Sequence, residues 1–411
     1  MAQQTQTKPL REVAEIISGF AFKSSEFSKH GIPIIRISNI INGDKVIILE
    51  ESQPYYNGKI DDRIKNYIIK KFDILIALSG ATTGKIGIYY EDKPSLLNQR
   101  IALIRRKDEK SNKYLYYFLQ TKSQQILKEA YGGAQPNISP KNIEKYEIFY
   151  PSEQKQSLIV QAIETQFTRL DESVKLLNLV KAKLEVYRKA VLKKKLDGLK
   201  TKKLVDFCNN FKQDIVDGPF GSDLQRKDYL TQGIPVLKIQ NVKENKIFLK
   251  KMDYISEQKY LELERHSFKP GDIVITKLGN PLGVAAIVPP EIKKGVIVAD
   301  LVRIRAQKIN TKYLCYALNS TKISNFINSK QKGTTRPRVK LSIVRELPIP
   351  IPENEIDQHN IVSEIESKFS VIDKIETVVE ASLEKADKLR KSILKSAFEG
   401  KLVKVEEVKD V

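Results

Sequence analysis

The hydrophobic pattern of the chain alternates between short strand-like runs and long helical stripes. Runs rich in Ile and Val, such as IPIIRIS from residue 32 and DILIAL from residue 73, are bounded by Gly, Asn, Asp or Pro. This pattern predicts β-strands joined by turns. Residues 114–127 and 313–327 carry helical spacing instead. The fold class predicted for these parts is α+β.

The same series of segments occurs twice in the same order. GIPIIRISNI at 31–40 returns as GIPVLKIQNV at 233–242, and FDILIALSGATTGKIGI at 72–88 returns as GDIVITKLGNPLGVAAI at 271–287. The offset between matching segments stays between 198 and 202 residues. An internal repeat of this kind predicts two similar mixed α/β domains related by a pseudo-two-fold repeat.

Each copy ends in a long apolar stripe with coiled-coil spacing. In the first copy the stripe steps by 3 or 4 residues and continues with a slip, through Ile163, Phe167, Leu170, Val174, Leu177, Val180, Leu184, Tyr187 and Val191. In the second copy it contains Ile365, Phe369, Ile372, Val379, Leu383, Ala386, Leu389, Ile393 and Ala397. The stripes end in RKAVLKKKLDG and RKSILKSAFEG, so Gly198 and Gly400 are the predicted helix C-terminal residues.

A helix of about 35 residues would be about 50 Å long and could not bury its own stripe. We therefore predict that the two long helices are antiparallel, form an intramolecular coiled coil and separate the two domains. The predicted divisions of the chain are residues 1–150 for the first domain, 151–199 for the first helical region, 200–350 for the second domain and 351–411 for the second helical region.

The charge of the chain suggests a polyanionic partner. Lys and Arg outnumber Asp and Glu by 71 to 50, which gives a net charge of +21 and a pI near 9.5, and a nucleic acid is the first candidate. The chain has only Cys208 and Cys315, which are far apart, and we expect neither a disulfide framework nor a zinc site. No apolar run approaches the length of a membrane span, and we expect a cytoplasmic protein.

In the order and duplication of these segments, the sequence resembles the specificity subunit of type I restriction-modification systems. PSEQKQSLIVQAIE at 151–164 and RKSILKSAFEGKL at 390–402 carry the resemblance most closely. It implies two target-recognition domains that each read one half of a split DNA sequence, and helical regions that set the gap and bind methyltransferase subunits. One departure lies at 352–358, where PENEIDQ replaces PSEQKQS and displaces the Gln that usually follows the Glu.

Candidate DNA-contacting residues are cations, amides and hydroxyls in Gly-flanked turns, because such groups hold phosphates or read base edges. Plain turn chemistry is the alternative explanation for the Asn and Gly residues. In the first copy the candidates are Lys23, Ser24, Arg36, Asn39, Ser79, Thr82, Thr83, Lys85, Asn98, Gln99, Arg100, Gln135 and Asn137. In the second copy they are Ser222, Lys238, Gln240, Asn241, Lys277, Asn280, Arg336, Arg338 and Lys340.

Several catalytic patterns compete with this interpretation. SGATTGK at 79–85 lacks the spacing of a nucleotide-binding P-loop. Asp73, Glu91 and Lys93 follow a D-x17-E-x-K pattern, echoed by Asp272, Glu291 and Lys293, which could hold Mg²⁺ for phosphodiester cleavage. Strand starts after turns explain both Asp residues without a metal. The Lys run at 193–195 either binds phosphate or is a solvated helix end.

The predicted function is DNA target recognition by a non-catalytic scaffold, since the sequence has no methyltransferase motif and no complete catalytic set. The resemblance implies two DNA methyltransferase subunits as partners, with restriction subunits bound through them and no membrane association. S-adenosylmethionine, ATP and Mg²⁺ are then expected on those partners, with no cofactor or metal on this chain. A stand-alone DNA-binding regulator and a Mg²⁺-dependent nuclease are the alternatives.

Overall fold

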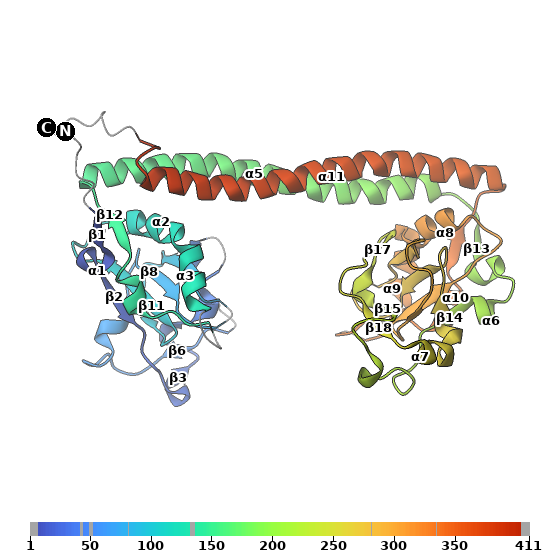
Figure 1. The fold of residues 1–411 in the computed structure, drawn as a ribbon, viewed down its shortest axis with the longest axis horizontal. Helices are drawn as coiled ribbons and strands as arrows, with labels where there is room; N and C mark the ends of the chain where they lie inside the picture. The colour runs from blue at the N-terminus through green and yellow to red at the C-terminus, as the bar shows by residue number, and fades with distance from the viewer. Residues whose placement is uncertain are drawn as a thin grey trace. The chain divides into compact units, whose positions relative to one another are not determined.

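The computed structural model describes residues 7–41, 44–48, 52–80, 82–131, 136–280, 282–333 and 335–403. The chain divides into two compact units, one comprising residues 1–177 and 381–411 and the other residues 178–380. Each unit contains one globule and a section of both long helices (Figure 1). No helix in the described ranges is long and apolar enough to cross a membrane.

In the first unit, the described residues form two five-stranded sheets and a strand pair. One sheet has the order β2 (Ala14–Ser18), β11 (Ile101–Arg106), β8 (Ile74–Ala77), β9 (Ile86–Tyr89) and β5 (Asp44–Val46). The other has the order β3 (Phe27–Ser28), β6 (Tyr55–Tyr56), β4 (Ile32–Ile35), β10 (Ser95–Leu97) and β7 (Ile68–Ile69). β1 (Thr7–Pro9) pairs with β12 (Glu147–Phe149) and joins the start of the chain to the strand before the first long helix.

The second unit repeats this plan with four-stranded sheets. One sheet has the order β14 (Ile215–Asp217), β23 (Leu301–Ile304), β20 (Ile273–Thr276) and β21 (Ala285–Ile287). The other has the order β18 (Asp253–Ile255), β15 (Ile234–Leu237), β22 (Gly295–Ile297) and β19 (Ser267–Phe268). Two strand pairs accompany them, β13 (Thr201–Lys203) with β24 (Pro348–Pro350), and β16 (Val242–Lys243) with β17 (Lys246–Ile247).

Short helices connect and cover the sheets. The predicted helical segments are each broken in two, into α2 (Lys113–Thr121) with α3 (Ser123–Ala130), and α8 (Thr311–Leu318) with α9 (Thr321–Lys330). The other α-helices are α1 (Leu10–Val13), α4 (Pro140–Ile143), α6 (Phe211–Asp214), α7 (Glu257–Glu262) and α10 (Leu341–Arg345). Single 3₁₀ turns are η1 (Ser24–Glu26), η2 (Ile37–Asn39), η3 (Lys65–Tyr67), η4 (Leu204–Phe207), η5 (Arg226–Asp228), η6 (Ile239–Asn241) and η7 (Glu264–His266).

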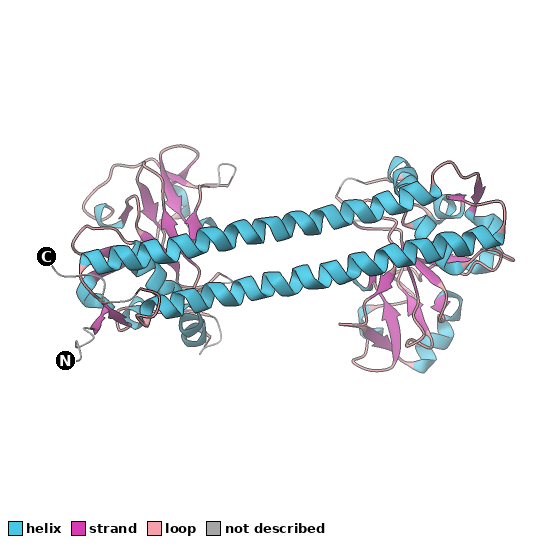
Figure 2. Cartoon of the chain, turned by 90° about the horizontal axis from the view of Figure 1, so that it is seen from above, coloured by secondary structure: helices cyan, strands magenta, loops and turns pink. Residues whose placement is uncertain are grey.

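The predicted pair of long helices is present, and both helices are longer than the sequence stripe indicated. α5 (Glu153–Leu196) and α11 (Glu355–Phe398) each have 44 residues. Within each unit their sections lie side by side (Figure 2). In the second unit Lys181 pairs with Glu380, Arg188 with Asp373 and Glu376, and Lys195 with Glu364. The partner number falls as the α5 number rises, so the pairing is antiparallel.

The apolar stripes are only partly buried. Ile163 and Phe167 join the core of the first unit with Ile393 and Ala397, while Leu184 and Val191 join that of the second with Ile365 and Phe369. The prediction is wrong for Val180, Tyr187 and Leu389, whose side chains are exposed. The first two lie after the slip in the α5 stripe, where spacing alone does not show which face turns inward.

Both long helices end at the predicted glycines. Gly198 and Gly400 follow α5 and α11 with positive φ angles of 79° and 73°. At the second of these ends, the Lys401 amide donates to the Ser396 carbonyl at 2.8 Å. Glycine adopts this left-handed conformation without the steric cost of a Cβ, which explains why the sequence stops the helix there.

Candidate nucleic-acid interface

The two globules present equivalent turns at one end of their strands. β8 pairs with β11 so that Ile74 faces Ile104, and β20 pairs with β23 so that Ile273 faces Ile304. After these strands, Gly80 and Gly279 have φ angles of 89° and 105°. Left-handed backbone of this kind favours glycine. The turns therefore start at matching places in the two copies.

In the first globule, three of the predicted segments meet at this end. The Leu78 amide donates to the Arg100 carbonyl at 2.9 Å, and the Asn98 amide donates to the Ile35 carbonyl at 3.1 Å. Ser79 forms a β-bridge with Asn137. The end of β4, the turn at 98–100, the turn after β8 and the segment at 136–138 are thus neighbours.

The second globule brings the corresponding segments together. The Lys277 amide donates to the Asp300 carbonyl at 2.9 Å, and the Val298 amide donates to the Leu237 carbonyl at 3.1 Å. Leu278 forms a β-bridge with Arg338. Arg338 therefore occupies the place that Asn137 has in the first globule, and Lys277 occupies that of Leu78.

Two predicted amides are structural. Asn39 and Asn241 are each 1% exposed. The Asn39 amide donates to the Ile47 carbonyl at 2.7 Å, and that of Asn241 donates to the Phe248 carbonyl at 3.0 Å. Their Oδ1 atoms accept from the Arg36 and Lys238 amides. Because these groups are buried and bonded, we remove both residues from the proposed DNA-contacting set; turn chemistry accounts for them.

Three predicted cations have partners within the protein. Arg36 donates to the Ser52 carbonyl at 2.8 Å. Lys238 lies 2.5 Å from Asp253 and over the Tyr229 ring, and Lys277 lies 2.5 Å from Asp217. Neutralised in this way, the two lysines attract phosphate less than free lysines would. Asp217 and Asp253 were not among the predicted residues, since neither has a local sequence signal that marks its partner.

The remaining candidates differ in exposure. Thr83 is buried, and its hydroxyl donates to the Gly80 carbonyl at 2.6 Å, so we remove it as well. Gln135 lies outside the described residues. Ser79, Thr82, Lys85 and Asn98 are half-buried. The exposed candidates are Lys23, Ser24, Gln99, Arg100 and Asn137 in the first globule, and Ser222, Gln240, Asn280, Arg336, Arg338 and Lys340 in the second.

The two aspartates of the alternative nuclease pattern are buried and form ion pairs with arginines. Asp73 accepts from Arg105 Nε at 2.7 Å, and Asp272 accepts from Arg305 Nε at 2.8 Å and Nη2 at 2.7 Å. These hydrogen bonds raise the pKa of both guanidinium groups. No group of three or more His, Cys, Asp or Glu that could hold a metal occurs among the residues described.

Three Lys side chains at and after the end of α5 pair with glutamates, and both Cys thiols are buried. Lys195 pairs with Glu364, Lys200 with Glu353 at 3.3 Å and Lys203 with Glu346 at 2.6 Å, while Lys193 and Lys194 are exposed. Burial raises the pKa of the Cys208 and Cys315 thiols to about 12. A thiol with such a pKa is not a nucleophile at neutral pH.

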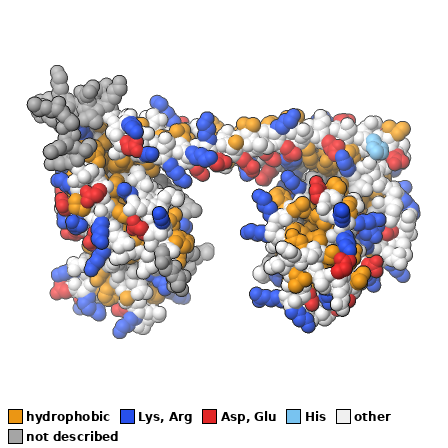
Figure 3. All heavy atoms as spheres, viewed as in Figure 1, with side chains coloured by type: hydrophobic (Ala, Val, Ile, Leu, Met, Phe, Trp, Pro, Cys, Tyr) orange, Lys and Arg blue, Asp and Glu red, His pale blue; other side chains and the backbone are white. Residues whose placement is uncertain are grey.

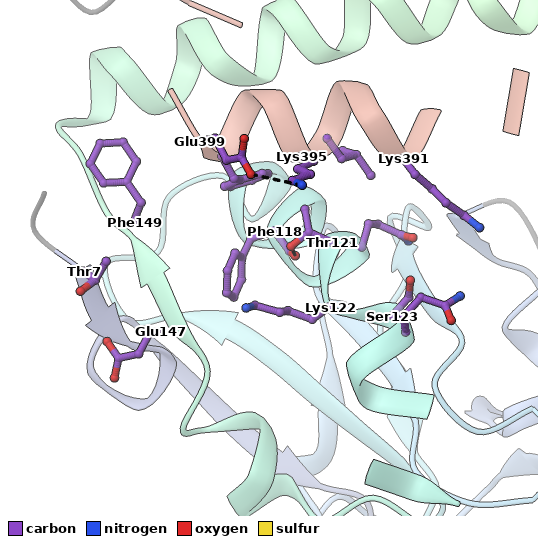
Figure 4. A pocket seen from close by; sticks show the side chains of 14 residues that line it. Thr7, Phe118, Thr121, Lys122, Ser123, Glu147, Phe149, Lys391, Lys395 and Glu399 are labelled. Atoms are coloured by element: carbon purple, nitrogen blue, oxygen red, sulfur yellow. Dashed lines mark hydrogen bonds and ion pairs between the residues drawn. The ribbon is translucent and has the colours of Figure 1, made fainter. Parts of the chain in front are cut away.

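A cavity of about 510 Å³ lies in the first unit beside the last turns of α11 (Figure 4). Phe118, Leu394 and Phe398 line it, together with Lys395, whose ammonium lies 3.7 Å from Glu399. The second unit has a cavity of about 320 Å³ beside the last turns of α5, at Lys193, Leu196 and Asp197. Neither lining contains His or Cys. The cavities mark matching junctions between helix and globule, and they offer no catalytic set.

Charge alone does not locate the interface. Lys and Arg side chains are spread over the visible face of each globule, with Asp and Glu among them (Figure 3). The strand-end turns are distinguished by their exposed amides and guanidinium groups instead. Such groups can donate and accept in pairs, as base edges require.

Comparison with known proteins gives a consistent assignment. The chain is 26% identical over 416 residues to the type I restriction enzyme EcoBI specificity subunit of Escherichia coli, covering 95% of this chain and 84% of that protein. It is 23% identical to the MjaVIII specificity subunit of Methanocaldococcus jannaschii, covering 93% and 97%.

A solved chain of a type I restriction-modification complex has the same fold, with a TM-score of 0.69 at 16% identity, covering 96% of this chain and 98% of that one. The family model for the type I restriction modification DNA specificity domain matches residues 3–185 and 197–385. The chain belongs to this family of type I specificity subunits, and its function is DNA target recognition without catalysis of its own.

Proposed function

We propose that this chain reads a split, asymmetric DNA target with its two globules and holds two methyltransferase subunits, through which restriction subunits bind. S-adenosylmethionine, ATP and Mg²⁺ belong to those partners. The exposed turn residues at the strand ends contact the DNA, and each globule reads one half of the target.

The asymmetry of the target follows from the difference between equivalent positions. Asn137 and Arg338 occupy matching bridge positions in the two globules. Asparagine pairs with adenine through N6 and N7, whereas arginine pairs with guanine through O6 and N7. Two surfaces with the same backbone and different donors and acceptors favour two different half-sites.

The proposed number of methyltransferase subunits rests on one observation about the long helices. Leu176 of α5 and Val378 of α11, which are 202 positions apart, are 62% and 64% exposed. Tyr187 and Leu389, also 202 apart, are 49% and 47% exposed. The first unit contains Leu176 and Leu389, and the second contains Tyr187 and Val378. Among the exposed apolar residues of the helices, each unit thus contains one member of each equivalent pair, one on α5 and one on α11, as two copies of one partner would require.

Unit-selective variants test this proposal in complexes assembled with the methyltransferase. Leu176→Glu with Leu389→Glu should remove one methyltransferase copy, and Tyr187→Glu with Val378→Glu should remove the other, because a charge in an apolar contact is not solvated. Ser173→Glu, at an exposed polar position of α5, is the control and should leave both copies bound.

Native mass measurement gives the stoichiometry of each complex. A wild-type complex with one methyltransferase, or two copies retained in both double variants, would contradict the proposed docking sites. A chain that binds DNA specifically but no methyltransferase would instead be a stand-alone regulator. Methylation should require the partner and S-adenosylmethionine, with none by this chain alone.

A further inference from the structure

Phe220 is an aromatic residue of the second globule whose side chain is mostly exposed to solvent. Its side chain is 66% exposed, the largest exposed fraction of any aromatic residue in the described part of the chain. The two residues before it, Gly218 and Pro219, are buried. A Cβ on Gly218 would lie 2.2 Å from the backbone of Val298, so the base of the loop is tightly packed. The ring is presented to solvent from a fixed base.

The loop that carries Phe220 is longer than its counterpart in the first globule. Gly218 corresponds to Gly19, since each packs against the backbone of the neighbouring turn, at Val298 and Asn98. Gln225 corresponds to Lys23, since each precedes a 3₁₀ turn and donates its amide to an acidic residue three positions later. The segment from Gly218 to Gln225 spans seven steps and that from Gly19 to Lys23 four. The second globule therefore has three extra residues here.

The extra loop lies beside the proposed DNA-contacting turns. The Lys277 ammonium lies 5.8 Å from the centre of the Phe220 ring and is held by Asp217 at 2.5 Å. Lys277 precedes Leu278, which bridges to Arg338. The ring thus belongs to the same end of the globule as the exposed arginines. An apolar ring therefore lies next to a cation at the end of the globule that carries the exposed polar candidates.

We propose that Phe220 contacts the C5-methyl group of a thymine in the half-site read by the second globule, an inference that rests on the proposed function. In the major groove a base pair presents hydrogen-bond donors and acceptors, and thymine adds the one apolar group, its methyl. An exposed phenyl ring among polar readers matches that group. Phe220 is then a residue that determines specificity for one position of the target.

Selection from random duplex pools tests the contact and identifies the target sequence at the same time. One pool contains thymidine and the other deoxyuridine, which pairs identically but lacks the methyl group. The wild-type chain should enrich the same motif from both pools, with the preference at one half-site position about fourfold weaker for uracil, which is the value of one buried methyl-sized group. Phe220→Ala should remove that difference and leave the other half-site unchanged.

Phe211→Ala is the matched control. Phe211 is also exposed and lies under a cation, with Arg345 5.3 Å from its ring, but it precedes β14 whereas Phe220 follows it. Phe211→Ala should behave as the wild type. Equal wild-type preference for thymine and uracil at every position, or a thymine preference that Phe220→Ala retains, would overturn the inference. If the wild-type chain enriches no motif from either pool, the proposed function itself fails and the inference with it.

Discussion

In the first globule Asp73 pairs with Arg105, and in the second Asp272 pairs with Arg305. Tyr114 donates its hydroxyl to the Phe149 carbonyl at 2.6 Å, and Tyr313 donates to that of Pro350 at 2.9 Å. Both tyrosines are almost completely buried. The repeat thus preserves the buried polar contacts that fix the sheets and the joint with the long helix.

At the strand ends the two globules differ. Leu78 corresponds to Lys277, Asn137 corresponds to Arg338, and the loop with Phe220 has three residues more than its counterpart. Asn137, Arg338 and Phe220 can vary because their side chains are exposed and lie outside the core, whereas Leu78 is buried in it. The buried contacts that both copies share form a duplicated frame that holds the structure, and we propose that the strand-end turns determine the specificity.

The strongest test of this division is an exchange of a whole globule. Replacing residues 1–150 with the first domain of another family member should change one half of the methylated sequence completely and leave the other half intact. Sequencing of methylated bases in DNA from cells that contain the hybrid complex measures both halves. A hybrid that changes both halves would show that the globules do not read DNA independently.

The buried Asp–Arg ion pair should contribute similarly to the stability of the two units. Asp73→Ala and Asp272→Ala each leave a guanidinium without its buried partner, and each should lower the free energy of unfolding of its unit by about 3 kcal/mol. Chemical denaturation measures the loss. Asp92→Ala removes a surface ion pair with Lys71 and should cost less than about 1 kcal/mol. A large loss of stability in one unit only would mean that the two ion pairs do not have the same structural role.

Side chains at the strand ends should affect binding and leave folding unchanged. Arg338→Ala should weaken binding to the specific target by about 1 to 3 kcal/mol, if the lost contact is a bidentate pair with guanine. Asn137→Ala, at the equivalent position, should weaken binding through the other half-site. Titration of labelled duplexes measures affinity, and unfolding curves should match the wild type. Unchanged affinity for Arg338→Ala and Arg336→Ala together would remove this segment from the interface.

The sequence predicted the parts of this architecture that depend on periodicity and on glycine. The repeat, the two long helices and their ends at Gly198 and Gly400 follow from spacing and from backbone conformations that other residues avoid. Asn39 and Asn241 could not be assigned correctly, because an amide that caps a turn and an amide that reads a base have the same sequence environment.

Contacts between residues that are far apart in the sequence could not be predicted either. Lys277 and Asp217 are 60 positions apart, and nothing local marks one as the partner of the other. FKSS at 22–25 and FGSD at 220–223 look alike in the sequence, but because of the three extra residues before Gln225 the structure matches Lys23 to Gln225. By sequence likeness Phe220 would correspond to Phe22, which is buried, whereas Phe220 is exposed.

The segment before each long helix combines a buried contact found in both copies with the sequence change at 352–358. At 352–358 no Gln directly follows a Glu as Gln154 follows Glu153, yet a second glutamine, Gln156 in one copy and Gln358 in the other, is buried in both. Gln156 accepts from Arg106 Nη1 at 3.0 Å, whereas Gln358 accepts from the Asn310 amide at 3.0 Å. Ala306 stands where the first copy has Arg106. The glutamine is retained in both copies while its donor changes from a charged side chain to a neutral backbone amide.

This difference predicts unequal costs for the same substitution. Gln156→Ala leaves a nearly buried guanidinium short of one acceptor and should lower the free energy of unfolding by about 2 kcal/mol, whereas Gln358→Ala should cost about 1 kcal/mol, because hydrogen bonds to charged groups contribute more than neutral ones. Gln154→Ala, at the exposed position after Glu153, should change stability by less than about 0.5 kcal/mol. Denaturation of the three variants gives the order directly. If Gln358→Ala cost as much as Gln156→Ala, the charge of Arg106 would contribute nothing measurable to stability. The cost at both positions would then come from the packing of the glutamine itself.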